Sequence, residues 1–131
     1  MRQYFCVCYV KIRAKTNILK GVDVKMKEEV VFLSHGESLL VLLQCEIDHH
    51  TAKRIRELID REFFRVKPEC LMLDFSGVGF MDSSGVGLIL GRAEAAGRNG
   101  AAVRLSGLSD GLMKLVRLSG IERIKNLSIS K

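Results

Sequence analysis

Residues 80–87 read F-M-D-S-S-G-V-G and connect an apolar, strand-like run to a segment with helical periodicity. The preceding run, C-L-M-L-D-F at 70–75, is typical of a strand that is covered on both faces. After the serine pair, a helical apolar stripe extends to about residue 98 and consists of Val86, Ile89, Ala93 and Ala96, with Leu90 beside it. The junction therefore predicts a strand, a turn and a helix, with two hydroxyl groups where the helix begins.

The same alternation extends in both directions along the chain. Further strand-like apolar runs are predicted at 28–33, 39–44, 101–105 and 121–127. Asp48 is the predicted N-cap of a helix whose apolar stripe reaches Phe63, and Ser109 or Asp110 opens a short helix near the end of the chain. Strands that alternate with helices imply right-handed crossovers, so we predict the α/β class with a largely parallel sheet.

Positive charge is concentrated at the start of the chain. The 131 residues carry a formal charge of +6, and residues 1–25 hold six basic residues against one acidic residue. We treat 1–25 as a basic N-terminal extension that is either disordered or not translated, with Met26 as the alternative start, and 26–131 as the single domain. Because the domain itself is almost neutral, we expect no direct binding of nucleic acid.

Several further classes of protein and site are disfavoured. No apolar run approaches the ~20 residues that a membrane span needs, and the apolar N-terminal stretch lacks a small-residue cleavage site, so we expect no membrane association and a cytoplasmic location. We expect no cofactor and no metal, because the cysteines form no paired knuckles and His49 and His50 are adjacent, so that on a helix they diverge by about 100°. Reduced, partly buried thiols are expected for Cys6, Cys8, Cys45 and Cys70.

The serine pair has three interpretations. Ser83 or Ser84 can act as the N-cap of the following helix, which stabilises it by ~1 kcal/mol. A catalytic nucleophile is disfavoured, because M-D-S-S-G is not a G-x-S-x-G elbow and no histidine follows in triad order, so we expect no enzyme and no catalytic residue. The third interpretation is modification: a phosphate at this turn adds about −1.5 to −2 charges beside Asp82 while the helix amides accommodate it.

The quoted motif, together with C-E-I-D-H-H-T-A at 45–52 and L-M-L-D-F at 71–75, resembles the STAS domain family. Within that family it is more similar to the anti-sigma factor antagonists of the sporulation type. The downstream L-V-R-L-S-G-I-E-R-I at 115–124 also fits, and the resemblance covers about residues 26–127. It implies a small α/β domain with a mixed, mostly parallel sheet and helices packed on one side.

The resemblance also implies a function. Unphosphorylated members bind an anti-sigma factor that is also a serine kinase and so free its sigma factor; phosphorylation releases the antagonist, and a phosphoserine phosphatase resets it. The phosphorylated residue corresponds to Ser83. The partner-binding residues that the resemblance implies are Asp48, His49, Thr51, Asp82, Ser83, Ser84 and Gly85.

Two departures and one alternative accompany the resemblance. Cys45 stands where the family usually has glycine, and the chain stops where the sporulation antagonist continues into a final helix. The alternative function is a STAS subunit that is not phosphorylated and that works in a stress-signalling or lipid-transport assembly. We interpret Lys53, Arg54, Arg56 and Arg61, on the helix after Asp48, as a solvated face rather than a docking face.

Overall fold

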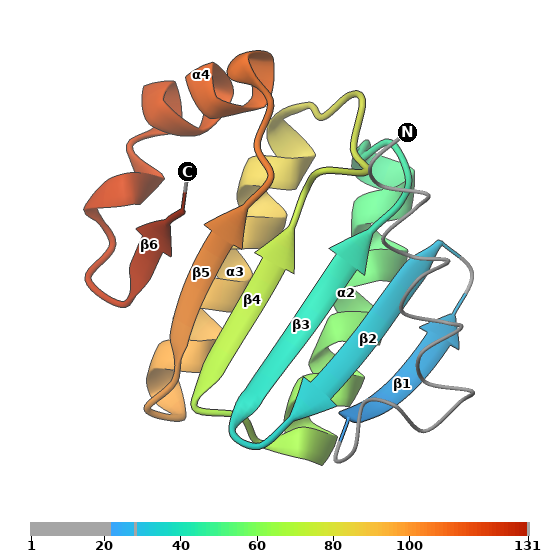
Figure 1. Ribbon diagram of the computed structural model, residues 1–131. Helices are drawn as coiled ribbons and strands as arrows, with labels where there is room; N and C mark the ends of the chain where they lie inside the picture. Colours follow the sequence, from blue (N-terminus) through green and yellow to red (C-terminus); the bar gives the residue numbers. More distant parts are fainter. Residues whose placement is uncertain (1–21, 28, 131) are drawn as a thin grey trace.

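Six strands form one sheet, and two long helices lie together on one of its faces (Figure 1). In this computed structural model residues 22–27 and 29–130 are described. The strands are β1 (Val22–Lys27), β2 (Val30–His35), β3 (Ser38–Leu43), β4 (Cys70–Asp74), β5 (Ala102–Ser106) and β6 (Leu127–Ile129). The helices are α2 (His49–Val66), α3 (Ser83–Arg98) and α4 (Asp110–Ser119), followed by the 3-10 turn η1 (Ile121–Arg123).

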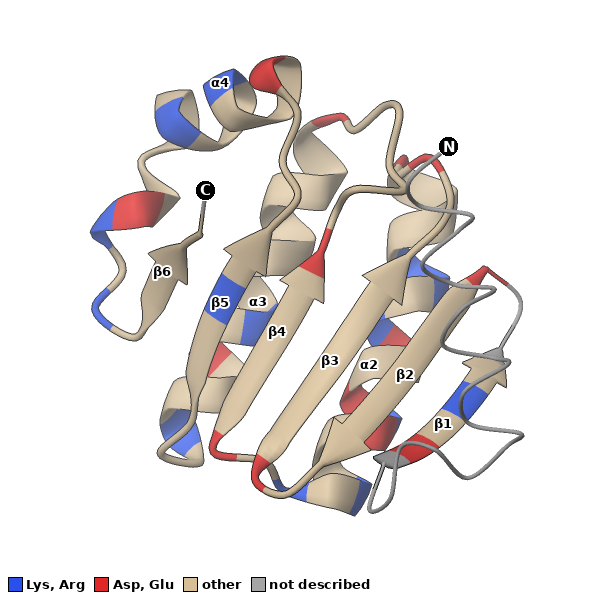
Figure 2. Ribbon diagram, in the orientation of Figure 1, with Lys and Arg blue, Asp and Glu red and all other residues tan. Residues whose placement is uncertain are grey.

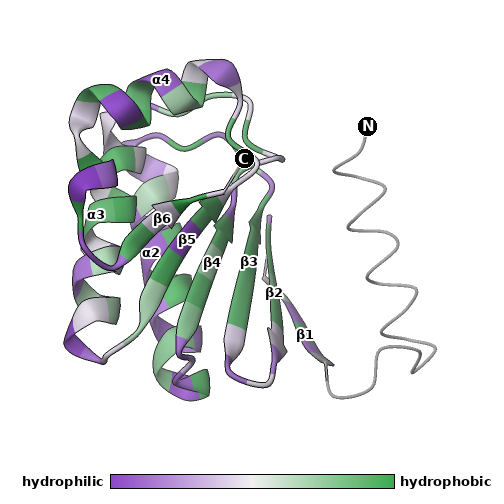
Figure 3. Ribbon diagram, turned by 60° about the vertical axis from the view of Figure 1, so that its left-hand side comes forward, coloured by the Kyte–Doolittle hydropathy of each residue, from purple (hydrophilic) through white to green (hydrophobic). Residues whose placement is uncertain are grey.

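The strand order follows the sequence. β1, β2 and β3 pair antiparallel, and β3, β4, β5 and β6 pair parallel, so three of the five pairings are parallel. The helices α2 and α3 are the crossovers between parallel strands and cover the same face of the sheet, as the turned view shows (Figure 3). The predicted fold class, a single α/β domain with a mixed, mostly parallel sheet and helices on one side, is confirmed.

The core lies between that face and the two helices. Every second residue of the central strands faces it, and Leu39, Val41 and Leu43 of β3 are all fully buried. Ile55 and Ile59 of α2 are also fully buried in this core, as the spacing of its apolar residues predicts. The helices are thereby fixed in position by packing, which determines where their N-termini lie.

The structure corrects three details of the sequence interpretation. The run 121–127 is not one strand: Ile121 is buried in η1, and only Leu127–Ile129 pairs with β5. In α3, Leu90 is 45% exposed, because its neighbour Ile89 points to the core and consecutive helical residues diverge by about 100°. Arg92 is buried between α2 and α3, which the sequence did not indicate.

The boundary predicted between residues 25 and 26 falls inside β1. This strand pairs with β2 from Val22 onward, so the sheet starts before Met26. Residues 1–21, including Cys6 and Cys8, lie outside the described part of the chain. Within that described part, no helix combines the length and the apolar character that a membrane crossing requires.

Candidate functional site

Two loops meet at the end of the sheet where the parallel strands β3 and β4 finish. Ile47 and Met81 form an isolated parallel bridge, in which the Ile47 N–H donates to the Phe80 carbonyl (2.9 Å) and the Asp82 N–H donates to the Ile47 carbonyl (3.1 Å). Both Ile47 and Met81 are buried. The helices that follow, α2 and α3, therefore begin side by side, and we call residues 46–51 and 80–85 the rim.

Side-chain hydrogen bonds hold the start of α2. Asp48 is the N-cap, and its Oδ1 accepts from the N–H groups of His50 (2.9 Å) and Thr51 (3.0 Å). The Thr51 hydroxyl completes a capping box by accepting from the Asp48 N–H (2.9 Å), and it donates to the Glu46 carbonyl (2.8 Å). The predicted Asp48 cap is confirmed, and the Thr51 hydroxyl is used in hydrogen bonds within the protein.

The start of α3 is built differently. Its N-cap is Asp82, whose Oδ1 accepts from the Ser84 N–H (2.8 Å). The interpretation of Ser83 or Ser84 as the cap is therefore wrong, because the carboxylate one residue earlier already fills that role. Neither serine hydroxyl forms a hydrogen bond with the described residues; Ser83 is exposed and Ser84 is half-buried. Both alcohols are left available for other chemistry.

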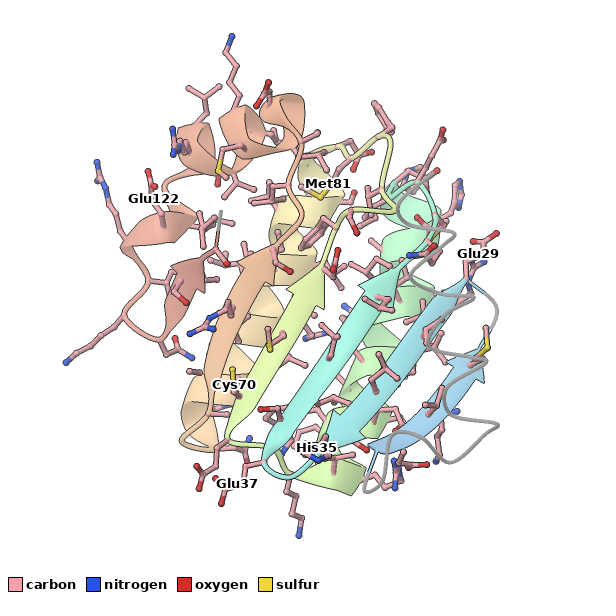
Figure 4. The ribbon with its side chains drawn as sticks, in the orientation of Figure 1. Glu29, His35, Glu37, Cys70, Met81 and Glu122 are labelled. Carbon is pink, nitrogen blue, oxygen red and sulfur yellow. The ribbon has the colours of Figure 1, made fainter. Side chains whose placement is uncertain are left out.

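Gly85 is a packing residue of the rim. It is buried, and a Cβ at this position would overlap the Met81 side chain and lie 3.3 Å from Ile47 Cγ2. Figure 4 shows Met81 at the end of the sheet where α3 begins, opposite to Cys70 and His35. Since Gly85 has no side chain, α3 packs closely on the bridge that joins the two loops.

The two adjacent histidines lie closer than the sequence predicts. The ring centroids of His49 and His50 are 4.0 Å apart with an interplanar angle of 38°, although they are consecutive residues of α2. Both are exposed. Within residues 22–27 and 29–130, no group of three or more His, Cys, Asp or Glu side chains is arranged to hold a metal ion.

The local environment lowers the pKa of the Asp48 carboxyl in the rim and raises the pKa of the Cys45 thiol next to it. The Thr51 backbone N–H holds the pKa of Asp48 below its usual value, with a further contribution from the His50 N–H. Burial raises the pKa of Cys45 to about 11, assisted by Glu29, so its thiol stays protonated at neutral pH. Lys67 is the only non-glycine residue with a positive φ in the described chain, so Cys45 replaces the family glycine without backbone strain.

Two features of the site were missed from the sequence. Phe80, the first residue of the second rim segment, is 51% exposed, and the sequence analysis did not single it out. A groove of about 400 Å³ also runs between α2 and α3 from the rim, and Lys53 and Arg56 line it. Which charged residues of α2 flank α3 depends on how the helices pack, and no local signal reveals it.

Comparison with known proteins finds relatives that match most of the described chain. A family model described as the STAS domain matches residues 29–130. An anti-sigma F factor antagonist from Paenibacillus polymyxa is 31% identical over 99 residues, which cover 76% of this chain and 85% of that protein.

Two solved structures are similar in fold and in sequence. One is the anti-sigma factor antagonist SpoIIAA in its unphosphorylated form, with a TM-score of 0.62 and 26% identity, covering 84% of this chain and 88% of that one. The other is the Bacillus cell fate determinant SpoIIAA in the phosphorylated form, with a TM-score of 0.57 and 26% identity, covering 84% and 91%.

Proposed function

The chain belongs to the STAS domain family, and on that premise we propose that it is an anti-sigma factor antagonist switched by phosphorylation of Ser83. The unmodified protein binds an anti-sigma factor that is also a serine kinase, and this binding frees a sigma factor. Phosphorylated protein is released and is reset by a phosphoserine phosphatase. The protein itself is not an enzyme, works in the cytoplasm, and contacts neither nucleic acid nor membrane.

The observation that carries this proposal is the state of the Ser83 side chain. Ser83 is exposed at the first position of α3, and Asp82 already caps the helix, so the alcohol has no structural hydrogen bond among the described residues. A kinase therefore reaches the hydroxyl without unfolding the rim. A phosphate at that place lies at the positive end of the helix dipole, which stabilises it by electrostatic attraction and hydrogen bonding.

Phosphoryl transfer changes the rim in charge and in size. The bond between Ser83 Oγ and the γ-phosphorus of ATP forms as the bond to the bridging oxygen breaks; ADP leaves, and the hydroxyl proton passes to a base of the kinase. The product carries about two negative charges close to Asp82. A partner that fits the neutral serine then meets a bulky anion, so binding fails while the fold persists.

Relatives support the same interpretation. The similar solved structures include an anti-sigma factor antagonist in an unphosphorylated and in a phosphorylated form, which is the pair of states the proposal requires. In this chain we assign direct partner contact to Asp48, His49, Asp82, Ser83 and Ser84. Thr51 and Gly85 contribute indirectly, since one braces the start of α2 and the other is buried against Met81.

The proposal is tested by incubation with the cognate anti-sigma factor kinase and ATP, followed by mass mapping of the modified peptide. We expect phosphate on Ser83, no incorporation into Ser83→Ala, and normal incorporation into the matched variant Ser84→Ala. Incorporation into Ser83→Ala at the wild-type rate would place the site elsewhere. A chain that binds its partner but accepts no phosphate would be a STAS interaction subunit without a switch.

A further inference from the structure

The groove between α2 and α3 opens directly from the rim. Lys53 and Arg56 line it from α2, and Ser84, Gly87 and Leu88 line it from α3. Ala52 and Leu88 are buried, and Gly87 adds no side chain, so the groove remains open along the α3 side. Its volume of about 400 Å³ accommodates a few amino-acid side chains from another protein.

Within the described part of the chain, no carboxylate pairs with the two cations that line this groove. Lys53 and Arg56 are both exposed, and neither forms an ion pair with the described residues. Other basic residues of α2 do so: Arg54 pairs with Glu29 at 3.4 Å, and Arg65 pairs with Glu62 at 2.9 Å. Figure 2 shows acidic and basic residues mixed along α2. The groove therefore carries two positive charges that have no carboxylate partner among residues 22–27 and 29–130.

A buried arginine, Arg92, connects the two helices that form the groove. Arg92 of α3 donates from Nη1 to the Arg56 carbonyl (3.4 Å), and its Nε lies 3.1 Å from Asp60 Oδ1, an ion pair outside hydrogen-bond geometry. These contacts tie α3 to the middle of α2. The groove is consequently held by two packed helices rather than by a loop, which lowers the entropic cost of binding a ligand there.

We propose that this basic groove binds an acidic segment of the anti-sigma factor kinase. The inference rests on the proposed function, because it names the chemistry by which that partner is recognised. Charge complementarity favours carboxylates opposite Lys53 and Arg56. Continuity favours the same partner as the rim, because His49 and Ser84 belong to both surfaces.

This docking surface also explains how phosphorylation of Ser83 weakens partner binding. A phosphate on Ser83 lies next to Ser84, at the end of the groove that meets the rim. The phosphate repels an acidic segment and competes with it for the groove cations. Phosphorylation thus weakens docking along the groove as well as at the rim.

The test compares two double charge reversals of equal size. Lys53→Glu with Arg56→Glu alters the groove, and the control Arg61→Glu with Lys114→Glu alters exposed cations that do not line it. Affinity for the cognate kinase is measured by calorimetry at low and high salt, with thermal unfolding as the check on folding. We expect the groove variant to bind about tenfold or more weakly and to lose most of its salt dependence, while the control stays within about twofold of wild type.

Other results separate this inference from the proposed function. If the groove variant binds like wild type while Ser83-phosphorylated protein does not bind, the groove inference is wrong and the switch stands. If unmodified wild-type protein does not bind the kinase, both fail. Tight binding of ATP alone at Gly87, followed by NMR, would assign the groove to a nucleotide instead and would overturn the acidic-segment proposal.

Discussion

The two helices that begin at the rim use the same local sequence plan in different ways. In each, a buried residue of the bridge is followed by an aspartate N-cap: Ile47 and Asp48 before α2, Met81 and Asp82 before α3. At the third helical position, α2 has Thr51 and α3 has Gly85. Thr51 completes a capping box, whereas Gly85 has no side chain because Met81 fills that space.

This difference means that the hydroxyl at the start of α2 supports the fold, whereas the hydroxyls at the start of α3 are available for function. Polar side chains stabilise the start of α2, and the Thr51 hydroxyl forms hydrogen bonds that support this fold. The Asp82 carboxylate and the close packing of Gly85 on Met81 stabilise the start of α3, so the hydroxyls of Ser83 and Ser84 are not needed for stability. Substitutions in the first turns of the two helices should therefore have different effects on folding and on binding.

The largest effect on stability is expected at Gly85. Gly85→Ala places a methyl group against Met81, and we expect a net loss of about 1–2 kcal/mol, because the cost of overpacking exceeds the gain in helix propensity. Gly91→Ala is the matched control in the same helix, where a Cβ meets nothing within 4 Å, and it should stabilise the protein by up to about 1 kcal/mol. Chemical denaturation measures both, and equal effects would mean that the α3 start is not held by packing.

A smaller effect is expected at Thr51. Thr51→Val keeps the shape but leaves the Asp48 N–H and the Glu46 carbonyl without their partner, at a cost of about 1 kcal/mol, or a few degrees in Tm. Ser83→Ala removes a hydroxyl that has no such partner among the described residues, so the stability of this variant should stay within about 0.5 kcal/mol of wild type. Differential scanning calorimetry compares them, and a Ser83→Ala protein as unstable as Thr51→Val would contradict the contrast between the helices.

The smallest expected effect is a pH dependence at α2. The pKa of Asp48 is lowered in the folded state by the Thr51 and His50 amides, so its contribution to stability is present above the unfolded pKa and is lost as pH falls through the folded pKa. Asp48→Asn keeps a capping oxygen without the charge. Melting curves at pH 7 and pH 3 should show a smaller acid loss for Asp48→Asn than for wild type, and identical losses would exclude this carboxylate as the cause.

The sequence predicts most of the fold, because its strongest signals are local and periodic. The strand at 70–75, the Asp48 cap and the helix after the serine pair are all found where the apolar spacing places them. The strict alternation of V-D-V-K-M-K at Val22–Lys27 is also a strand signal, and a boundary at residue 25 overlooks it. Ile121, Ile124 and Leu127 are spaced by three, which is typical of a helical turn rather than of a strand, and the prediction of a strand at 121–127 overlooked this signal.

The site was predicted less completely than the fold. Neighbouring residues can fill the same N-cap position, and the groove depends on tertiary packing. Asp82, Ser83 and Ser84 are all good N-caps, so local sequence alone cannot choose among three consecutive candidates. The groove depends on the approach of α3 to α2 through Arg92, a contact between residues 36 positions apart in sequence. Exposure of Phe80 likewise follows from the bridge between Ile47 and Met81, which only the folded chain creates.

The most direct measurement is the affinity for the cognate anti-sigma factor kinase of two samples of this protein, one bare and one fully phosphorylated at Ser83, with the Tm of each. Phosphorylation should weaken binding by at least about a hundredfold while leaving the Tm nearly unchanged. Equal affinities would contradict a charge switch at the start of α3, and a large fall in Tm would show that the phosphate acts by disrupting the fold.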